Sequence, residues 1–149
     1  MRAVLQRVRE ARVDIEGRLE AEISAGILAL AGFSRDDSDS DMDYVVEKIS
    51  TLRIFGDDEG RMNRSLLDVE GELLVVSQFT LYGDTRKGRR PSYSDAMEPE
   101  RALVFYEKFI QRCRARMPLV RCGVFGADMK VSLVNDGPVT LLVDSRKLF

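Results

Sequence analysis

The strongest constraint on the fold is a short apolar run in the first third of the chain, GILALAGF at residues 26–33. From Ile27 to Ala31 no polar residue interrupts the run, so the alternation of a half-exposed strand is missing. The run therefore predicts a strand that is buried on both faces. No uninterrupted apolar stretch exceeds five residues, which is far too short to cross a bilayer, and no membrane partner is expected.

The composition predicts a single folded domain over residues 1–149. Hydrophobic residues make up 44% of the chain and charged residues 32%, which is typical of soluble globular proteins. The N-terminal segment has neither the apolar stretch nor the cleavage-like site of a secretory signal. The two cysteines, Cys113 and Cys122, provide no disulfide framework, so a cytoplasmic protein is expected.

The charge pattern leaves two interpretations open. A formal net charge of −2 argues against an indiscriminate nucleic-acid or DNA binder. Two basic clusters nevertheless stand out, RKGRR at residues 86–90 and RCRARMPLVR at residues 112–121. They suit phosphate binding, and they suit a solvated charged surface equally well.

Alternation and turn residues predict most of the sheet. Residues 3–8 form a strand candidate, and residues 11–23 alternate around a Glu16-Gly17 turn as a hairpin does. Residues 72–81 predict one further strand. Residues 129–144 predict two strands that flank a tight Asn-Asp-Gly-Pro turn.

Two stretches have helical spacing instead. The first follows a run of serines and aspartates that suits a helix start, and the second begins near Pro99 and stops at Pro118. Their apolar faces are formed by Met42, Val45, Val46, Ile49 and Leu52 in the first and by Ala102, Tyr106, Phe109, Ile110, Cys113 and Met117 in the second. The predicted fold is α+β, with a mostly antiparallel, barrel-like β-sheet of about seven strands and two long helices in a single domain.

No metal or cofactor is expected. The chain contains no histidine. The acidic segment that starts at Asp37 has Met42 and Lys48 where a calcium loop needs glycine and glutamate.

The segment LVVSQFTLYGD, residues 74–84, starts as a buried strand and then introduces Ser77, Gln78 and Thr80. Because side chains alternate along a strand, Gln78 and Thr80 are expected to share a face at its carboxyl end. The Gln78 amide and the Thr80 hydroxyl could position an ester or a water molecule, and neighbouring backbone N–H groups could stabilise an oxyanion. From spacing alone, the simpler interpretation is that they satisfy backbone groups at the strand end.

The segment NDGPVT, residues 135–140, places a glycine directly before a proline in a predicted turn. An ordinary hairpin turn is the simpler interpretation, and a cis Gly137-Pro138 bond is the alternative. A threonine nucleophile is unconvincing on its own, because the chain has no histidine to activate it.

Taken together, SQFTL at residues 77–81 and NDGPVT at residues 135–140 resemble the paired signatures of the D-aminoacyl-tRNA deacylase family, also called D-tyrosyl-tRNA(Tyr) deacylase. The resemblance covers nearly the whole chain. It extends through LQRV at residues 5–8, RIF at residues 53–55, RPSYS at residues 90–94 and FGADMKVSLV before the second signature.

The resemblance implies a homodimeric, cytoplasmic hydrolase that cleaves the ester between an amino acid and the 3′-terminal adenosine of tRNA. Its substrates would be D-aminoacyl-tRNAs and mischarged glycyl-tRNA(Ala), whereas L-aminoacyl-tRNAs would be spared. Gly137 and Pro138 would form a cis peptide that reaches into the partner's pocket, fits a D-aminoacyl group and collides with an L side chain.

The resemblance also assigns the remaining site residues. Those expected at the scissile ester are Ser77, Gln78, Phe79 and Thr80; those expected at the adenosine are Phe125 and Met129. Arg7 would brace the Gly-Pro segment.

Without a general base, the preferred mechanism is assisted by the substrate. The ribose 2′-hydroxyl would activate or orient water, while the protein supplies positioning and oxyanion stabilisation. The alternatives are a non-catalytic tRNA-binding module that uses the two basic clusters and a dimeric structural protein whose Gly-Pro turn packs at an interface.

Overall fold

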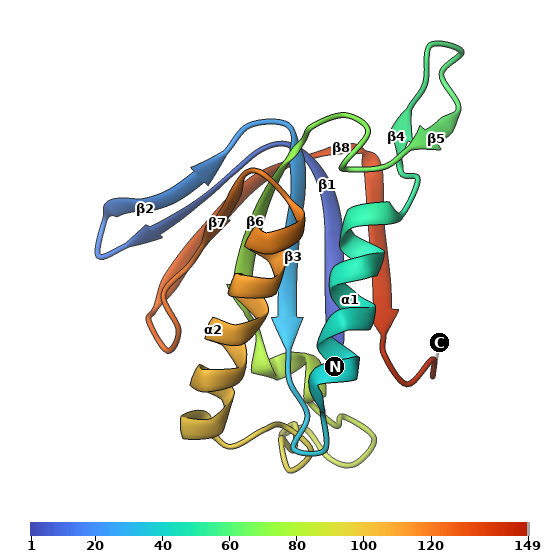
Figure 1. Ribbon diagram of the computed structural model, residues 1–149. Coiled ribbons are helices and arrows are strands. Elements are labelled where there is room, and N and C mark those ends of the chain that lie inside the picture. Colours follow the sequence, from blue (N-terminus) through green and yellow to red (C-terminus); the bar gives the residue numbers. More distant parts are fainter. Residues whose placement is uncertain (149) are drawn as a thin grey trace.

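The computed structural model describes residues 1–148 and shows a strongly curved mixed sheet with two helices packed on one of its faces (Figure 1). The elements in chain order are β1 (Arg2–Ile15), β2 (Arg18–Ile23), β3 (Gly26–Gly32), α1 (Asp39–Thr51), β4 (Phe55–Gly56), β5 (Met62–Arg64), β6 (Glu72–Ser77), the 3₁₀ helix η1 (Phe79–Tyr82), α2 (Pro99–Arg116), β7 (Val120–Cys122) and β8 (Met129–Asp144).

The main sheet has the order β2-β1-β3-β6-β7, with β8 on the other edge of β1. The β1–β2, β1–β3 and β1–β8 pairs are antiparallel, and the β3–β6 and β6–β7 pairs are parallel. The predicted fold class, a mostly antiparallel and barrel-like sheet with two long helices, is confirmed.

The apolar run at residues 26–33 forms β3, which is buried on both faces as predicted. Ile27, Ala29 and Ala31 belong to the cluster that packs under the helices, whereas Leu28 belongs to the cluster on the opposite face of the sheet. The adjacent strand β6 divides in the same way. This central parallel pair therefore connects the two halves of the core.

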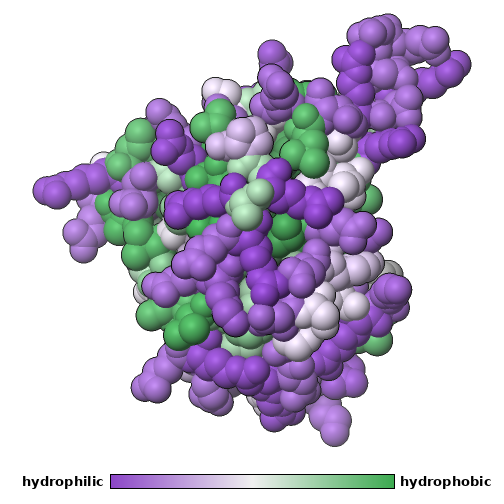
Figure 2. Space-filling view, viewed as in Figure 1, coloured by the Kyte–Doolittle hydropathy of each residue, from purple (hydrophilic) through white to green (hydrophobic). Residues whose placement is uncertain are grey.

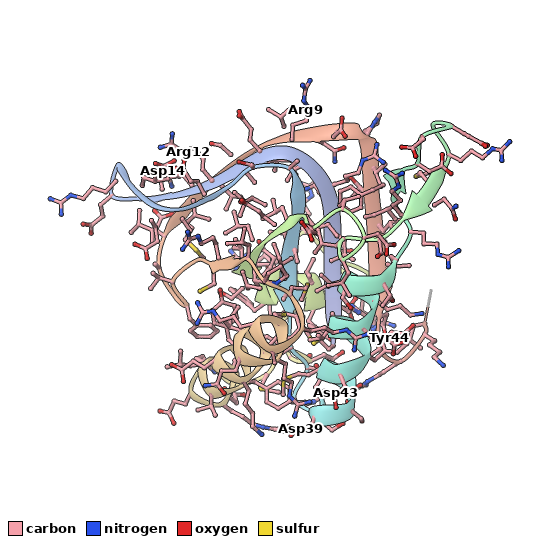
Figure 3. The ribbon with its side chains drawn as sticks, turned by 45° about the horizontal axis from the view of Figure 1, so that its top comes forward. Arg9, Arg12, Asp14, Asp39, Asp43 and Tyr44 are labelled. Atoms are coloured by element: carbon pink, nitrogen blue, oxygen red, sulfur yellow. The ribbon has the colours of Figure 1, made fainter. Side chains whose placement is uncertain are left out.

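Both predicted helices form, with the predicted apolar residues buried apart from Leu52, which is half-buried. Polar side chains link the helices across their outer surface, where Arg112 on α2 contacts Asp39 and Asp43 on α1 (Figure 3). The β4–β5 hairpin projects from the body of the molecule and is hydrophilic over its surface (Figure 2).

Two predictions about strands are wrong. The strand that starts at Glu72 ends at Ser77 rather than Leu81, because the chain turns into η1. Residues 129–144 do not form a hairpin, since they continue in one direction along β1 as the single strand β8. The Asn-Asp-Gly-Pro segment instead interrupts the pairing of β8 with β1, between the pairs Val8↔Asn135 and Gln6↔Thr140.

The first turn of α1 supplies a prediction about pH. Burial raises the pKa of Asp41, but hydrogen bonds from Ser145 and Ser38 outweigh it and lower the pKa from 3.8 to about 2. Because the folded protein binds this proton more weakly than the unfolded chain, Asp41 stabilises the fold above about pH 4 and its contribution is lost as the pH falls through 2. The Asp41→Asn variant should be about 1 kcal/mol less stable at pH 7, with a shallower loss of stability between pH 4 and pH 2.

Urea unfolding at a series of pH values measures both effects. Asp58→Asn, which changes a largely exposed carboxylate, is the control and should follow the wild-type curve. An Asp41→Asn curve parallel to that of the wild type would contradict the assignment.

Candidate active site

A cavity of about 570 Å³ opens at the carboxyl ends of β3 and β6. Ala31 and Ser77, which face each other across this parallel pair, lie in its wall. The start of α2 and the loop between β7 and β8 complete the lining, whose other members are Phe33, Val76, Gln78, Phe79, Tyr93, Ala96, Met97, Glu98, Pro99, Ala102, Phe125, Gly126, Ala127, Met129 and Val131. The cavity is thus mostly apolar, with a few polar groups near the end of β6 and the Glu98 carboxylate at the start of α2.

The turn after β6 is fixed by backbone hydrogen bonds. The Gln78 N–H donates to the Ala31 carbonyl at 2.7 Å, and the Leu81 N–H donates to the Gln78 carbonyl at 3.2 Å. Within this turn the Gln78 amide donates to the Thr80 hydroxyl. Gln78 and Thr80 therefore do lie side by side, but through a 3₁₀ turn rather than through the shared strand face that alternation predicts.

The same turn leaves two backbone donors free. At the start of a 3₁₀ helix the first N–H groups have no carbonyl behind them to bind. Among residues 1–148, the N–H groups of Phe79 and Thr80 find no acceptor. They lie beside Ser77, whose hydroxyl is half-buried at the cavity wall.

Tyr106 of α2 holds two walls of the cavity together from behind. Its buried hydroxyl lies 3.0 Å from the carbonyl of Val75 on β6 and 3.0 Å from the carbonyl of Gly123 at the start of the β7–β8 loop. Burial raises the pKa of this phenol, so it is a neutral donor. Its ring packs against Phe125, with 5.8 Å between the centroids, and so supports the loop that carries Phe125.

The Gly137-Pro138 peptide is cis and exposed, at the interruption in β8. The Asn135 side chain closes this segment, because its amide donates to the Val139 carbonyl at 3.2 Å and its oxygen accepts from the Val139 N–H at 2.8 Å. Sequence reasoning missed Asn135. Its signal is the ability of asparagine to bind the backbone of a following turn.

Arg7 on β1 contacts the same segment. Its Nε donates to the Asp136 carbonyl at 3.0 Å and lies 3.4 Å from the Asp136 carboxylate, and a second nitrogen donates to the Ile54 carbonyl. A Cβ atom added to Gly137, whose φ is +128°, would lie 2.7 Å from Arg7 Nη2. The Arg7 guanidinium and the Gly137 backbone are therefore in close contact, with no room for a side chain between them.

The structure divides the predicted site residues into two groups. Ser77, Gln78, Phe79, Phe125 and Met129 line the cavity, and Thr80 adjoins it through Gln78. Arg7, Gly137 and Pro138 lie elsewhere. Arg7 pairs with Ile27, four residues before Ala31 on β3, which corresponds to a separation of about 13 Å along the strand.

Over residues 1–148, no group of three or more potential ligand side chains is arranged to hold a metal ion. No helix in the same range is both long and apolar enough to span a membrane.

The comparisons with known proteins agree with the motifs. A sequence model for the family described as D-Tyr-tRNA(Tyr) deacylase matches residues 4–144. The chain belongs to this family. The resemblance predicted from SQFTL and NDGPVT is thereby confirmed.

Relatives and solved structures match along almost the entire chain. The D-aminoacyl-tRNA deacylase of Thermosipho africanus is 57% identical over 149 residues and that of Syntrophus aciditrophicus 56%, each with full coverage of both chains. A structure named c-Myc DNA Unwinding Element Binding Protein is 40% identical with a TM-score of 0.92, covering 97% of this chain and 98% of its own. A structure described as a probable eukaryotic D-amino acid tRNA deacylase shares the fold, with a TM-score of 0.83 at 19% identity, and covers 96% of this chain and 98% of its own.

Gly32 supplies a prediction about the turn after β6. A Cβ atom at Gly32 would lie 2.8 Å from the Gln78 carbonyl oxygen and 3.2 Å from Leu81 Cβ. Gly32→Ala should therefore displace η1 and lower the rate of ester hydrolysis about tenfold or more, since small misplacements are costly in a catalytic site. Gly56→Ala, with no atom within 4 Å of the new Cβ, is the matched control and should retain the wild-type rate.

Hydrolysis of D-aminoacyl-tRNA under single-turnover conditions measures the effect, and thermal unfolding shows whether the fold survives. A folded Gly32→Ala variant with wild-type activity would show that the position of η1 does not matter.

Proposed function

We propose that this protein hydrolyses the ester bond of D-aminoacyl-tRNA, releasing a free D-amino acid and tRNA, and that it also removes glycine mischarged onto tRNA(Ala). The observation that carries the proposal is the position of the SQFT segment at the cavity mouth in a member of the deacylase family. The D-aminoacyl-tRNA deacylases that match this chain over its full length support the same activity. A cytoplasmic location fits a substrate that is made there.

The cavity suits the aminoacyl end of the substrate. Phe125 and Met129 provide apolar surface for the terminal adenosine, opposite the end of β6. Ser77, Gln78 and Phe79 then lie around the ester. The free N–H groups of Phe79 and Thr80 are donors for the oxyanion that forms when water attacks the carbonyl carbon.

Chiral selection would come from a second copy of the chain. The Gly137-Pro138 segment is exposed and does not line the cavity of its own chain. Arg7, which contacts the segment, lies about 13 Å from the cavity along the strand direction. In the part of the chain that the structure describes, the outer edge of β8 has no strand partner, and Val134 and Leu142 on β8 are exposed. Such an edge favours association with another chain.

In that arrangement the filter is made of backbone. The Gly137-Pro138 segment would occupy the space into which an L side chain projects, while a D side chain or glycine avoids it. The hydrogen bonds of Asn135 with Val139 and of Arg7 with Asp136 fix the backbone conformation of this segment. Rejection by a fixed backbone works without reading the side chain, so one site serves many D-amino acids.

Catalysis would need no protein base. The hydroxyl of Thr80 accepts a hydrogen bond from Gln78, and among residues 1–148 no basic group contacts it. We assign proton transfer and water positioning to the ribose 2′-hydroxyl of the terminal adenosine. Thr80 then positions Gln78 and is not the nucleophile.

Nucleic-acid binding without hydrolysis is the second candidate. It is favoured by the 40%-identical structure, whose name describes a DNA-binding protein, and by the basic segment at residues 86–90. It predicts salt-sensitive binding of tRNA or DNA and no ester cleavage.

Matched D-Tyr-tRNA and L-Tyr-tRNA distinguish the two candidates. Purified protein should release tyrosine from the D-ester about a hundredfold faster than from the L-ester, and a chelator should leave the rate unchanged. Equal cleavage of both esters would show that the Gly137-Pro138 segment does not select between D- and L-aminoacyl groups. Binding of both without cleavage would favour the second candidate.

The role of the 2′-hydroxyl gives a separate prediction. A D-aminoacyl-tRNA whose terminal adenosine lacks the 2′-hydroxyl should be hydrolysed about 100-fold more slowly or worse, because proton transfer by a positioned group contributes that much. Thr80→Ala should retain most of the wild-type rate on the normal substrate. The opposite pattern would identify Thr80 as the nucleophile. In that pattern the Thr80→Ala variant binds tRNA but hydrolyses nothing, and the wild type hydrolyses the deoxy substrate at the normal rate.

A further inference from the structure

The loop between η1 and α2 is not explained by the chemistry of the cavity. It is closed at its base by two backbone hydrogen bonds, from the Asp84 N–H to the Ser92 carbonyl at 2.7 Å and from the Ser92 N–H to the Asp84 carbonyl at 3.0 Å. In Figure 1 this loop lies at the same end of the molecule as η1 and the start of α2. Residues 83–94, called the basic loop below, thus begin next to η1 and end beside the cavity.

The basic loop has a charge opposite to that of the whole chain. It contains four basic residues and one acidic residue, a formal net charge of +3, whereas the chain has −2. Asp84 is already paired with Arg86, with 2.7 Å between Oδ2 and Nη2. Lys87, Arg89 and Arg90 are exposed and form no hydrogen bond or ion pair with any residue from 1 to 148.

Two exposed aromatic rings, one on η1 and one in the basic loop, lie where the loop meets the cavity. Phe79 is 58% exposed and Tyr93 is 39% exposed, and both line the cavity. Their ring centroids are 5.1 Å apart in an edge-to-face arrangement, so each ring keeps a face open. Exposed aromatic side chains that lie together at a cavity are typical of ligand-binding sites.

Unpaired cations next to exposed aromatic faces are the combination that binds single-stranded nucleic acid. The bases stack on the rings, and the cations neutralise the phosphates between them. In the proposed reaction, the terminal adenosine enters the cavity and the nucleotides before it are unpaired. Because Phe79 and Tyr93 line the cavity and are exposed, their rings are accessible to these nucleotides.

We infer that the basic loop binds the unpaired nucleotides that precede the terminal adenosine of tRNA, with Lys87, Arg89 and Arg90 on phosphates and Tyr93 under a base. This inference rests on the proposed function for its choice of ligand. It assigns the loop to binding of the tRNA strand and not to chemistry at the ester.

The test compares two substrates with a triple variant. Lys87→Ala/Arg89→Ala/Arg90→Ala should lower kcat/KM for D-Tyr-tRNA about tenfold or more at moderate salt. It should leave kcat/KM unchanged for D-Tyr-adenosine, which has the same ester and adenosine but no phosphates. An equal loss on both substrates would overturn the inference, because it would place the loop in the chemistry or in the fold.

A control removes the same charge elsewhere. The control uses three exposed residues outside both basic clusters, namely Arg9 on β1 (labelled in Figure 3), Arg18 on β2 and Arg53 between α1 and β4. None of the three forms an ion pair within residues 1–148. The variant Arg9→Ala/Arg18→Ala/Arg53→Ala should keep the wild-type rate on D-Tyr-tRNA. A loss equal to that of the loop variant would show a nonspecific effect of charge and overturn the inference.

Binding of uncharged tRNA tests the loop independently of hydrolysis. The plot of log affinity against log salt should be shallower by about 2 for the loop variant than for the wild type, since each phosphate contact on a single strand contributes about 0.7. Tyr93→Leu should weaken binding about fivefold or more, whereas Tyr93→Phe should not. An unchanged salt slope would overturn the phosphate assignment.

The two proposals fail in different ways. A wild-type protein that hydrolyses no ester, but whose tRNA binding loses salt dependence in the loop variant, would refute the proposed function and support the loop. If the wild type and the loop variant hydrolyse D-Tyr-tRNA equally fast, the proposed function is supported and the assignment of the basic loop is refuted.

Discussion

The parallel pairing of β3 with β6 is the constraint on which the rest of the structure depends. Both strands are apolar on both faces, so they can only lie in the middle of the core. Their register places Ala31 opposite Ser77, and the Gln78 N–H binds the Ala31 carbonyl immediately after the last pair. Because the core fixes these strands, it also fixes the turn that presents the polar groups of the cavity.

The second half of the proposed site depends on β1 in the same way. This strand pairs with β8 along most of its length, and the pairing is interrupted where Gly137-Pro138 bulges outward. Arg7, on β1 itself, holds the bulge from behind. One continuous sheet therefore displays the cavity at one end and the Gly-Pro segment at another, which is the arrangement that two copies of the chain could use reciprocally.

The sequence predicted the parts of the fold that local periodicity controls. The run from Ile27 to Ala31 and the helical spacing of Met42 to Ile49 correspond directly to buried faces.

Prediction from the sequence failed where long-range strand pairing decides the path of the chain. Asn-Asp-Gly-Pro has the residues of a hairpin turn, but the register with β1 on either side keeps the chain moving in one direction. Likewise, alternation cannot show that β6 ends at Ser77, because the partner carbonyl comes from Ala31, far away in the sequence. The site residues were reached through family motifs, and the hydrogen bonds of Asn135 with Val139 were missed, because an asparagine before a turn indicates such bonds without identifying their partner.

The central claim, that a complete selective site needs two chains, can be tested with a mixed dimer. One chain carries Ala127→Trp, which is designed to obstruct its cavity from the β7–β8 loop. The other carries Gly137→Ala, at a position where the structure leaves no room for a Cβ atom. The chains are co-expressed with different C-terminal affinity tags and purified through both. The account predicts that the mixed dimer recovers the wild-type ratio of D-ester to L-ester hydrolysis, because its one open cavity faces an intact Gly-Pro segment. A mixed dimer with the defective ratio of the Gly137→Ala protein would contradict the account and place the filter within a single chain.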